Sequence, residues 1–85
     1  MLSIQTVPTG SMEPTIAKGS AILVDPIAVD DIAVDDVIVF AAPETRRMTV
    51  HRVTAIELDE QGPVFTTKGD ANDVPDPWRL TVEGD

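Results

Sequence analysis

A serine, a histidine and several aspartates in this chain could together cleave a peptide bond by acyl transfer. Ser11 supplies a hydroxyl, and His51, the only histidine, supplies a base. A hydroxyl is a weak nucleophile until a positioned base removes its proton during attack, and the usual pKa of histidine, about 6.5, suits that task. Asp70 or Asp76 could then hold and orient the imidazole. Such residues prove nothing by themselves, so the elements that position them decide the interpretation.

The segment around Ser11 predicts a tight corner. Thr9-Gly10 lets the backbone turn sharply, and Glu13-Pro14 then sets a turn or one short helical twist. The hydroxyl of Ser11 would therefore sit on a held corner. The ordinary alternative is that Ser11 only caps this twist, and taken alone the segment favours that alternative.

His51 lies in the longest predicted strand, residues 48–58. The alternation of side chains places His51 on one face with Val53 and Ala55, and puts Ile56 on the opposite face. A lone histidine on such an apolar face is more often a satisfied core residue than a catalytic one. Both interpretations predict a partly buried imidazole, so the pattern does not separate them.

A predicted hairpin brings acidic residues back toward His51. Residues 59–62 indicate its turn and residues 63–68 its returning strand. Counting outward from the turn leaves Asp70 nearly level with His51, so its carboxylate could reach the imidazole. The polar loop that follows contains Asp76, and its alternative role is a turn in which carboxylates cap backbone amides.

Length and composition predict one small, mostly β domain over residues 1–85, a β-barrel or curled sheet with short helical turns. A chain of this size hides only about 60% of its unfolded surface, so its core is thin. Trp78 is expected to anchor the last loop on that core rather than to stack on a ligand. Two apolar runs, 21–24 and 37–40, are predicted as buried strands. The other predicted strands are residues 2–7, 48–58, 63–68 and 79–82.

The composition excludes several classes of site and partner. With no cysteine and one histidine, neither a disulfide framework nor a structural zinc site is expected, and we predict no metal or cofactor. Fifteen acidic residues against six basic ones give a net charge of −9, which argues against nucleic acid as a partner. No apolar run approaches the ~20 residues that cross a bilayer, so the chain as given is expected to be soluble.

Five segments, in order, resemble the sequence boxes of type I signal peptidases. They are Thr9–Ile16, Lys18–Ser20, Asp36–Phe40, Thr49–Val53 and Thr67–Asn72. Because His51 stands where eubacterial members have lysine, the chain is similar to the archaeal, endoplasmic-reticulum and sporulation-type branch. The resemblance implies a mostly β fold whose active site lies on an exposed apolar surface facing the membrane, on its extracytoplasmic side.

The resemblance also implies a role for each candidate residue. Ser11 is the acylated nucleophile and His51 the general base. The aspartate of the Gly-Asp-Ala-Asn box corresponds to Asp70. A second aspartate, used by the His-type enzymes, corresponds to Asp76, with Asp73 as the near competitor. The sequence leaves open which of the three faces the imidazole.

Oxyanion and substrate contacts follow from the same resemblance. The backbone N–H of Ser11 would meet the oxyanion, and Thr9 stands where some relatives place a hydroxyl donor. The substrates would be signal peptides of secreted preproteins, cut after small residues at the −3 and −1 positions. The family has a membrane helix before the serine box that is missing from this fragment, so the full-length protein is expected at the membrane surface. Asp35 and Ser20 replace the family's usual glycine and aspartate, and neither touches the proposed chemistry.

Two other interpretations compete with the peptidase. The related self-cleaving repressors share a Ser-Met box and the β scaffold but use lysine as the base, and neither Lys18 nor Lys68 falls in the long predicted strand. A catalytically inactive β domain could instead bind hydrophobic peptides or a membrane partner. Inactive homologues usually lose the nucleophile or the base, whereas Ser11 and His51 are both present, so the sequence favours the peptidase.

Overall fold

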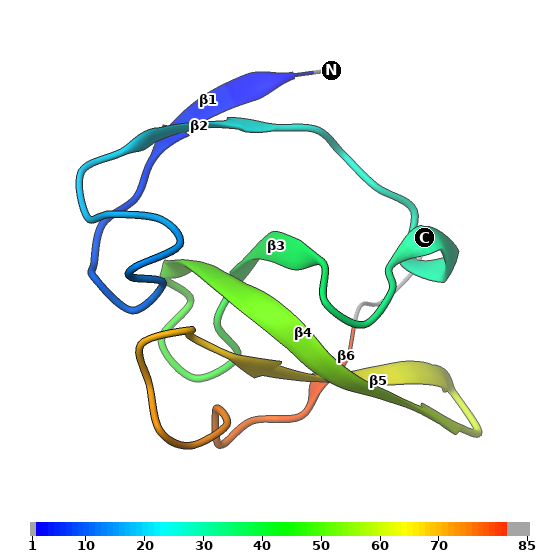
Figure 1. Cartoon of the computed structure of the whole chain (residues 1–85). Coiled ribbons are helices and arrows are strands. Elements are labelled where there is room, and N and C mark those ends of the chain that lie inside the picture. Colours follow the sequence, from blue (N-terminus) through cyan, green and yellow to red (C-terminus); the bar gives the residue numbers. More distant parts are fainter. Residues whose placement is uncertain (1, 82–85) are drawn as a thin grey trace.

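The structure, a computed structural model, describes residues 2–81 and consists mostly of β-strands, which confirms the predicted fold class (Figure 1). Strands β1 (Ser3–Thr6) and β2 (Ala21–Val24) form a two-stranded antiparallel sheet. The second sheet has the order β3-β4-β5-β6 and contains β3 (Val37–Ala41), β4 (Met48–Asp59), β5 (Gly62–Lys68) and β6 (Leu80–Thr81). A short 3-10 helix, η1 (Val29–Asp31), lies between β2 and β3.

Among residues 2–81 no helix is long and apolar enough to cross a bilayer. The predicted last strand ends at Val82, which lies outside the described residues.

Strand β4 is the centre of the larger sheet, because it pairs with β3 on one side and with β5 on the other (Figure 1). The β4–β5 connection is the predicted hairpin. The Gln61 N–H donates to the Asp59 side chain at 2.8 Å, and Gly62 has a φ of 124°, a backbone conformation that favours glycine. The hairpin therefore sets the register that carries the end of β5 back toward His51.

A β-bulge between Val53 and Ala55 divides β4 into two halves. One residue of β4 has no partner in β5 at this point of the register. The extra residue reverses the alternation beyond it, so Val53 and Ile56 pack in the same core cluster. The prediction that Ile56 lies on the face opposite Val53 is therefore wrong.

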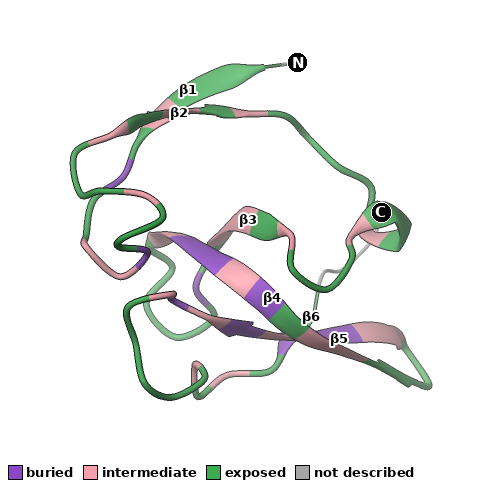
Figure 2. Ribbon diagram, viewed as in Figure 1, coloured by how far each residue is buried: buried purple, intermediate pink, exposed green. Residues whose placement is uncertain are grey.

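The core centres on Val53, Phe65 and Leu80, which come from β4, β5 and β6 (Figure 2). Phe65 is 1% exposed. Burying a side chain of this size contributes about 1.5–3 kcal/mol to stability. Trp78 packs against the cluster, which confirms that it anchors the last loop on the core.

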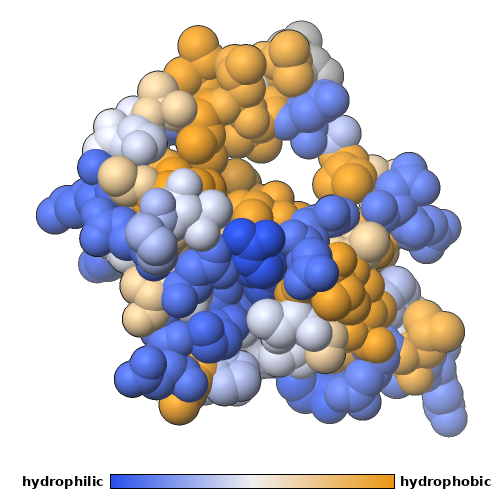
Figure 3. Space-filling model, in the orientation of Figure 1, coloured by the Kyte–Doolittle hydropathy of each residue, from blue (hydrophilic) through white to orange (hydrophobic). Residues whose placement is uncertain are grey.

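The β1–β2 hairpin stands apart from this core and exposes much of its apolar surface (Figures 1 and 3). Ile4 and Leu23 are each 70% exposed, and Leu2 is 61% exposed. A strand is present at residues 21–24, but the prediction that it is buried is wrong. The physical reason is that β2 pairs only with β1, and within residues 2–81 no further strand joins this ribbon.

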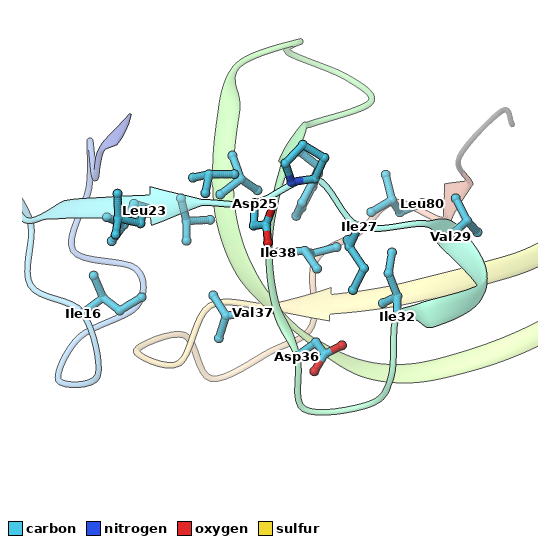
Figure 4. Close-up of a pocket in the computed structure, with 16 residues that line it drawn as sticks. Ile16, Leu23, Asp25, Ile27, Val29, Ile32, Asp36, Val37, Ile38 and Leu80 are labelled. Atoms are coloured by element: carbon cyan, nitrogen blue, oxygen red, sulfur yellow. The ribbon is translucent and has the colours of Figure 1, made fainter. Parts of the chain in front are cut away.

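An apolar groove lies between β2 and β3, strands that each have one unpaired edge (Figure 4). Its volume is about 690 Å³. Leu23 from β2, Ile38 from β3 and Ile27 from the connection between them contribute to its walls. Neither Ser11 nor His51 lines this groove, so it is separate from the site described next.

Candidate active site

Ser11 lies on a tight corner, as the sequence predicts. The Glu13 N–H donates to the Gly10 carbonyl at 3.0 Å, and the Ile16 N–H donates to the Met12 carbonyl at 2.9 Å. The side chain of Met12 is fully buried and anchors the corner in the molecule. Ser11 is therefore held firmly while its own side chain stays half-buried.

His51 lies between Ser11 and Asp76. Its Nε2 is 3.0 Å from the Ser11 Oγ, and its Nδ1 is 2.6 Å from the Asp76 Oδ2. His51 is 5% exposed, and its ring lies edge-on to Phe40 of β3 with the centroids 6.4 Å apart. Among the hydrogen bonds of residues 2–81, the Ser11 hydroxyl contacts His51 and Thr9 rather than an amide of the turn. This geometry does not support a purely capping role for Ser11.

Two side chains that the sequence did not assign to the site hold Asp76 in place. The Thr67 hydroxyl donates to the Asp76 Oδ2 at 2.7 Å, and the Asp76 N–H donates to the Thr67 carbonyl at 2.8 Å. The Trp78 indole N–H donates in turn to the Thr67 Oγ1 at 3.1 Å. One signal for Thr67 was available: it follows Phe65 by two residues in a strand, so it shares a buried face on which a hydroxyl needs a partner.

Asp70 faces Arg52 instead of His51. The Arg52 guanidinium pairs with both carboxylate oxygens, at 3.0 Å from Nε and 2.8 Å from Nη2, and the Thr15 hydroxyl donates at 2.7 Å. The hydrogen bonds from Arg52 and then Thr15 lower the pKa of Asp70 to about 2, and the bond to Asp70 raises the pKa of Arg52. The cluster ties the corner that carries Thr15 to β4. Asp73 is exposed and makes no side-chain hydrogen bond within the described part of the chain.

Gly69, and not Asp70, is the residue directly beside His51. A Cβ at Gly69 would lie 2.6 Å from the Ser11 carbonyl oxygen and 3.0 Å from the His51 Nε2. The Ala71 N–H donates to the same Ser11 carbonyl at 2.8 Å. The end of β5 thus approaches the Ser11 corner so closely that only glycine fits without a shift of the backbone.

Thr9 completes the contacts of Ser11. Its Oγ1 lies 3.0 Å from the Ser11 Oγ and accepts a hydrogen bond from the Ser11 N–H at 3.3 Å. One consistent set of donors has the Thr9 hydroxyl donating to the Ser11 Oγ and the Ser11 hydroxyl donating to the His51 Nε2. In this arrangement the proton of Ser11 points at the base.

A comparison with protein families matches residues 1–60 to the family described as signal peptidase, peptidase S26. The chain belongs to this signal peptidase family. The matched region contains Ser11 and His51 and ends before Asp70 and Asp76. The resemblance seen in the sequence is thereby confirmed at the level of the family. Comparisons with curated proteins and with solved structures gave no significant match.

In this signal peptidase family member a cleft of about 520 Å³ opens beside Ser11. Val7 and Pro8, just before the corner, contribute to its lining from one segment, and Met48 and Val50 contribute from β4. The surface of the cleft is mainly apolar. Among residues 2–81 no three histidine and carboxylate side chains lie close enough together to hold a metal ion.

Proposed function

We propose that this signal peptidase family member is a serine endopeptidase that removes N-terminal signal peptides from secreted preproteins. The observation that supports the proposal most directly is the hydrogen-bonded series from Ser11 through His51 to Asp76, with distances of 3.0 and 2.6 Å. The three residues come from segments 40 and 25 residues apart in the chain and meet beside an apolar cleft. A hydroxyl, a base and an orienting carboxylate in this order are the machinery of acyl transfer.

His51 acts as the general base and then as the general acid. Its Nε2 takes the Ser11 proton as Oγ attacks the scissile carbonyl carbon, and the Asp76 carboxylate stabilises the imidazolium that forms. The imidazolium gives that proton to the leaving amine as the C–N bond breaks, which leaves an ester on Ser11. His51 next deprotonates a water that attacks the ester, and the proton returns to Oγ as the acid product leaves.

The negative charge on the substrate's carbonyl oxygen needs donors beside Ser11. The Ser11 N–H and the Thr9 hydroxyl are the candidate donors, and they lie side by side, with the Ser11 N–H donating to the Thr9 Oγ1 at 3.3 Å. A substrate oxygen would replace this mutual contact. Loss of one oxyanion donor typically lowers the rate by about 10²–10³-fold.

Asp70 has a supporting role in this mechanism. Its paired contacts with Arg52 and Thr15 hold β4 against the corner that carries Ser11. Because its pKa is about 2, the carboxylate stays ionised and paired at every pH at which a neutral histidine can act as a base.

The cleft and the exposed hairpin support the choice of substrate. An extended peptide laid in this cleft of about 520 Å³, between the Val7–Thr9 segment and the start of β4, would bring a carbonyl to Ser11. Val7 directly follows β1, whose hairpin exposes apolar side chains such as Ile4 and Leu23. That surface suits a membrane on the extracytoplasmic side, where signal peptides emerge. The reaction requires no cofactor or metal.

Cleavage of a signal-peptide substrate tests the proposal. The substrate carries one small-x-small site and is incubated in detergent or lipid with the parent, Ser11→Ala, and Ser3→Ala as a matched serine control. We expect cleavage after the second small residue by the parent and by Ser3→Ala, and none by Ser11→Ala, as read by mass spectrometry. Equal cleavage by Ser11→Ala would refute the mechanism. If the parent cleaves in neither medium, the assay is repeated with a membrane helix fused before Ser3, and a continued lack of cleavage would support an inactive β domain that binds hydrophobic peptides or a membrane partner.

A further inference from the structure

A second series of hydrogen bonds reaches His51 from the side opposite Ser11. It runs from the Trp78 indole N–H to the Thr67 Oγ1 at 3.1 Å, and from the Thr67 hydroxyl to the Asp76 Oδ2 at 2.7 Å. The Asp76 Oδ2 is the same oxygen that lies 2.6 Å from the His51 Nδ1. The His51 Nδ1 and the Thr67 hydroxyl therefore both contact a single carboxylate oxygen, and the Trp78 N–H is linked to that oxygen through the Thr67 hydroxyl.

The direction of every bond in this series is fixed by chemistry. An ionised carboxylate only accepts, so the Thr67 hydroxyl must donate to Asp76, and its oxygen is then free to accept from the Trp78 N–H. The indole nitrogen only donates. For the contact with Asp76 to be a hydrogen bond, His51 must carry its proton on Nδ1. That tautomer leaves the lone pair of Nε2 directed at the Ser11 hydroxyl.

Burial restricts the Thr67 hydroxyl to its protein partners. Thr67 is fully buried, so its hydroxyl has no water to exchange with. Trp78 lies edge-on to Phe40 at 6.1 Å, and Phe40 lies edge-on to His51 at 6.4 Å, so the same indole supports the imidazole through packing as well. A ring and a hydroxyl therefore hold both partners of the Asp76–His51 bond.

No other charged side chain within residues 2–81 hydrogen-bonds this carboxylate. The nearby Asp70 is paired with Arg52, and the Lys68 ammonium donates to the Gly69 carbonyl at 3.3 Å. Within the described residues, the side chains that hydrogen-bond the Asp76 carboxylate are therefore those of Thr67 and His51.

We propose that Thr67 and Trp78 are positioning residues that lock the Asp76 carboxylate, and through it the Nδ1–H tautomer of His51. This inference rests on the proposed acyl-transfer function. It assigns catalytic influence to a buried strand residue and to an aromatic residue that the sequence predicts only as a core anchor. Neither side chain needs to touch the substrate to exert it.

Kinetics of three site variants and one control variant measure the effect on turnover. Thr67→Val keeps the shape of the side chain and removes the hydroxyl, and we expect kcat to fall about 10- to 100-fold, because the lost bond goes to a charged group. KM should stay unchanged. Thr67→Ser restores the hydroxyl and should stay within about threefold of the parent, whereas Trp78→Phe keeps a packed ring without the N–H and should lose less than about tenfold. Val64→Ala, a core truncation in the same strand, controls for a simple loss of stability and should keep the parent kcat while folded.

Nitrogen-15 NMR measures the positioning itself, whether or not the chain turns over substrate. The chain has one histidine and one tryptophan, so each ring gives a single, unambiguous set of signals. At a pH high enough for the imidazole to be neutral, we expect the parent ring to be the Nδ1–H tautomer. In Thr67→Val the imidazole should become a mixture of tautomers and the indole proton should shift upfield. In Thr67→Ser both signals should return to the parent positions.

The two measurements separate failure of this inference from failure of the proposed function. An unchanged kcat in Thr67→Val, an equal loss in Thr67→Ser, or imidazole signals that do not respond to the hydroxyl would each overturn the positioning role. If no variant cleaves substrate, the NMR comparison alone decides the inference, while the cleavage assay alone decides the function.

Discussion

At the level of single residues, two carboxylates of one loop face different partners. Asp76 lies 2.6 Å from the His51 Nδ1, whereas Asp70 lies 2.8 Å from the Arg52 Nη2. Only the first is placed to orient the imidazole. The second holds two segments of the chain together, so substitutions at the two positions should have different consequences.

Asparagine substitutions distinguish the two carboxylates. We expect Asp76→Asn to lower kcat by about 10³–10⁴-fold, because an amide can donate to Nδ1 and so favour the wrong tautomer of His51. Asp70→Asn should keep kcat within about tenfold of the parent at a temperature where it is folded. Steady-state kinetics on a signal-peptide substrate provide the measurement. A larger loss in Asp70→Asn than in Asp76→Asn would contradict the assignment of Asp76.

The ion pair of Asp70 predicts a loss of stability in acid. Its pKa in the folded chain is about 2, below the ordinary value of 3.8. The carboxylate therefore contributes its full stabilisation above about pH 5, and loses it as the pH falls from about 4 toward 2. We expect about 1 kcal/mol, since the pair is partly open to solvent. Thermal unfolding of the parent and of Asp70→Asn between pH 6 and 2.5 checks this, and a constant difference between the two curves would speak against it.

The sequence predicts which residue types form the candidate site, but not which of these residues contact one another. The Ser11 box and a histidine in a strand indicate chemistry locally, and the structure brings both together at 3.0 Å. The choice between Asp70 and Asp76 depends on Arg52 and on Thr67, which approach the loop from two different strands. Such contacts join segments far apart in the chain, and no local pattern encodes them.

At the level of elements, the turn into β3 contains a strained residue. Asp35 has a φ of 82°, in the left-handed region that non-glycine residues rarely adopt. Its N–H donates to the Val53 carbonyl at 2.8 Å, and its carbonyl accepts from the Arg52 Nη1 at 2.8 Å. The neighbouring strand therefore fixes this conformation. The positive φ at this position explains why the family that the sequence resembles usually has glycine here, where this chain has Asp35.

Replacing Asp35 with glycine should stabilise the chain. We expect a gain of about 1 kcal/mol, which corresponds to a rise in Tm of about 4–8 °C for a domain of this size. Asp30→Gly is the matched control, because it removes the same charge from η1, where the backbone has no need of glycine. It should lower the Tm or leave it unchanged. Circular dichroism melting curves decide, and a lower Tm in Asp35→Gly would disprove strain at this position.

Strands were predictable from the sequence because alternation and turn residues are local. The hairpin at Asp59 and Gly62 and the strand at 21–24 are examples, and both are present. Burial of β2 was not predictable, since it depends on which strands lie beside it. The bulge after Val53 was also hidden, because Thr54 continues an ordinary alternation. That one extra residue pairs Lys68 with Arg52 in place of Val53, which is why Asp70 is not level with His51.

At the level of the whole molecule, a patch of apolar surface covers the β1–β2 hairpin on the face shown in Figure 3, and Ile4 and Leu23 are each 70% exposed there. The hairpin leads directly into the corner that carries Ser11, so a surface that docks there lies close to the proposed site. The net charge of −9 opposes docking to anionic surfaces, which leaves apolar contact as the main attraction.

Vesicle flotation tests this surface. We expect the parent to bind zwitterionic vesicles, and the double variant Ile4→Ser, Leu23→Ser to bind at least about tenfold more weakly, because two exposed apolar side chains are lost. Leu58→Ser is the matched control, since Leu58 is 83% exposed on the β4–β5 hairpin. It should bind as the parent does. Equal loss in both variants would show that apolar content, and not this hairpin, governs binding.

The central claim of the proposed function is that Ser11 is acylated with His51 as the base. A p-nitrophenyl ester whose acyl part ends in small residues should acylate Ser11 faster than water hydrolyses the resulting ester, so that an acyl-enzyme accumulates. We expect a burst of about one equivalent of p-nitrophenol per chain, together with a mass increase on the peptide that contains Ser11. Ser11→Ala and His51→Ala should show neither. A label on another residue, or an equal burst from Ser11→Ala, would contradict a Ser11 acyl-enzyme.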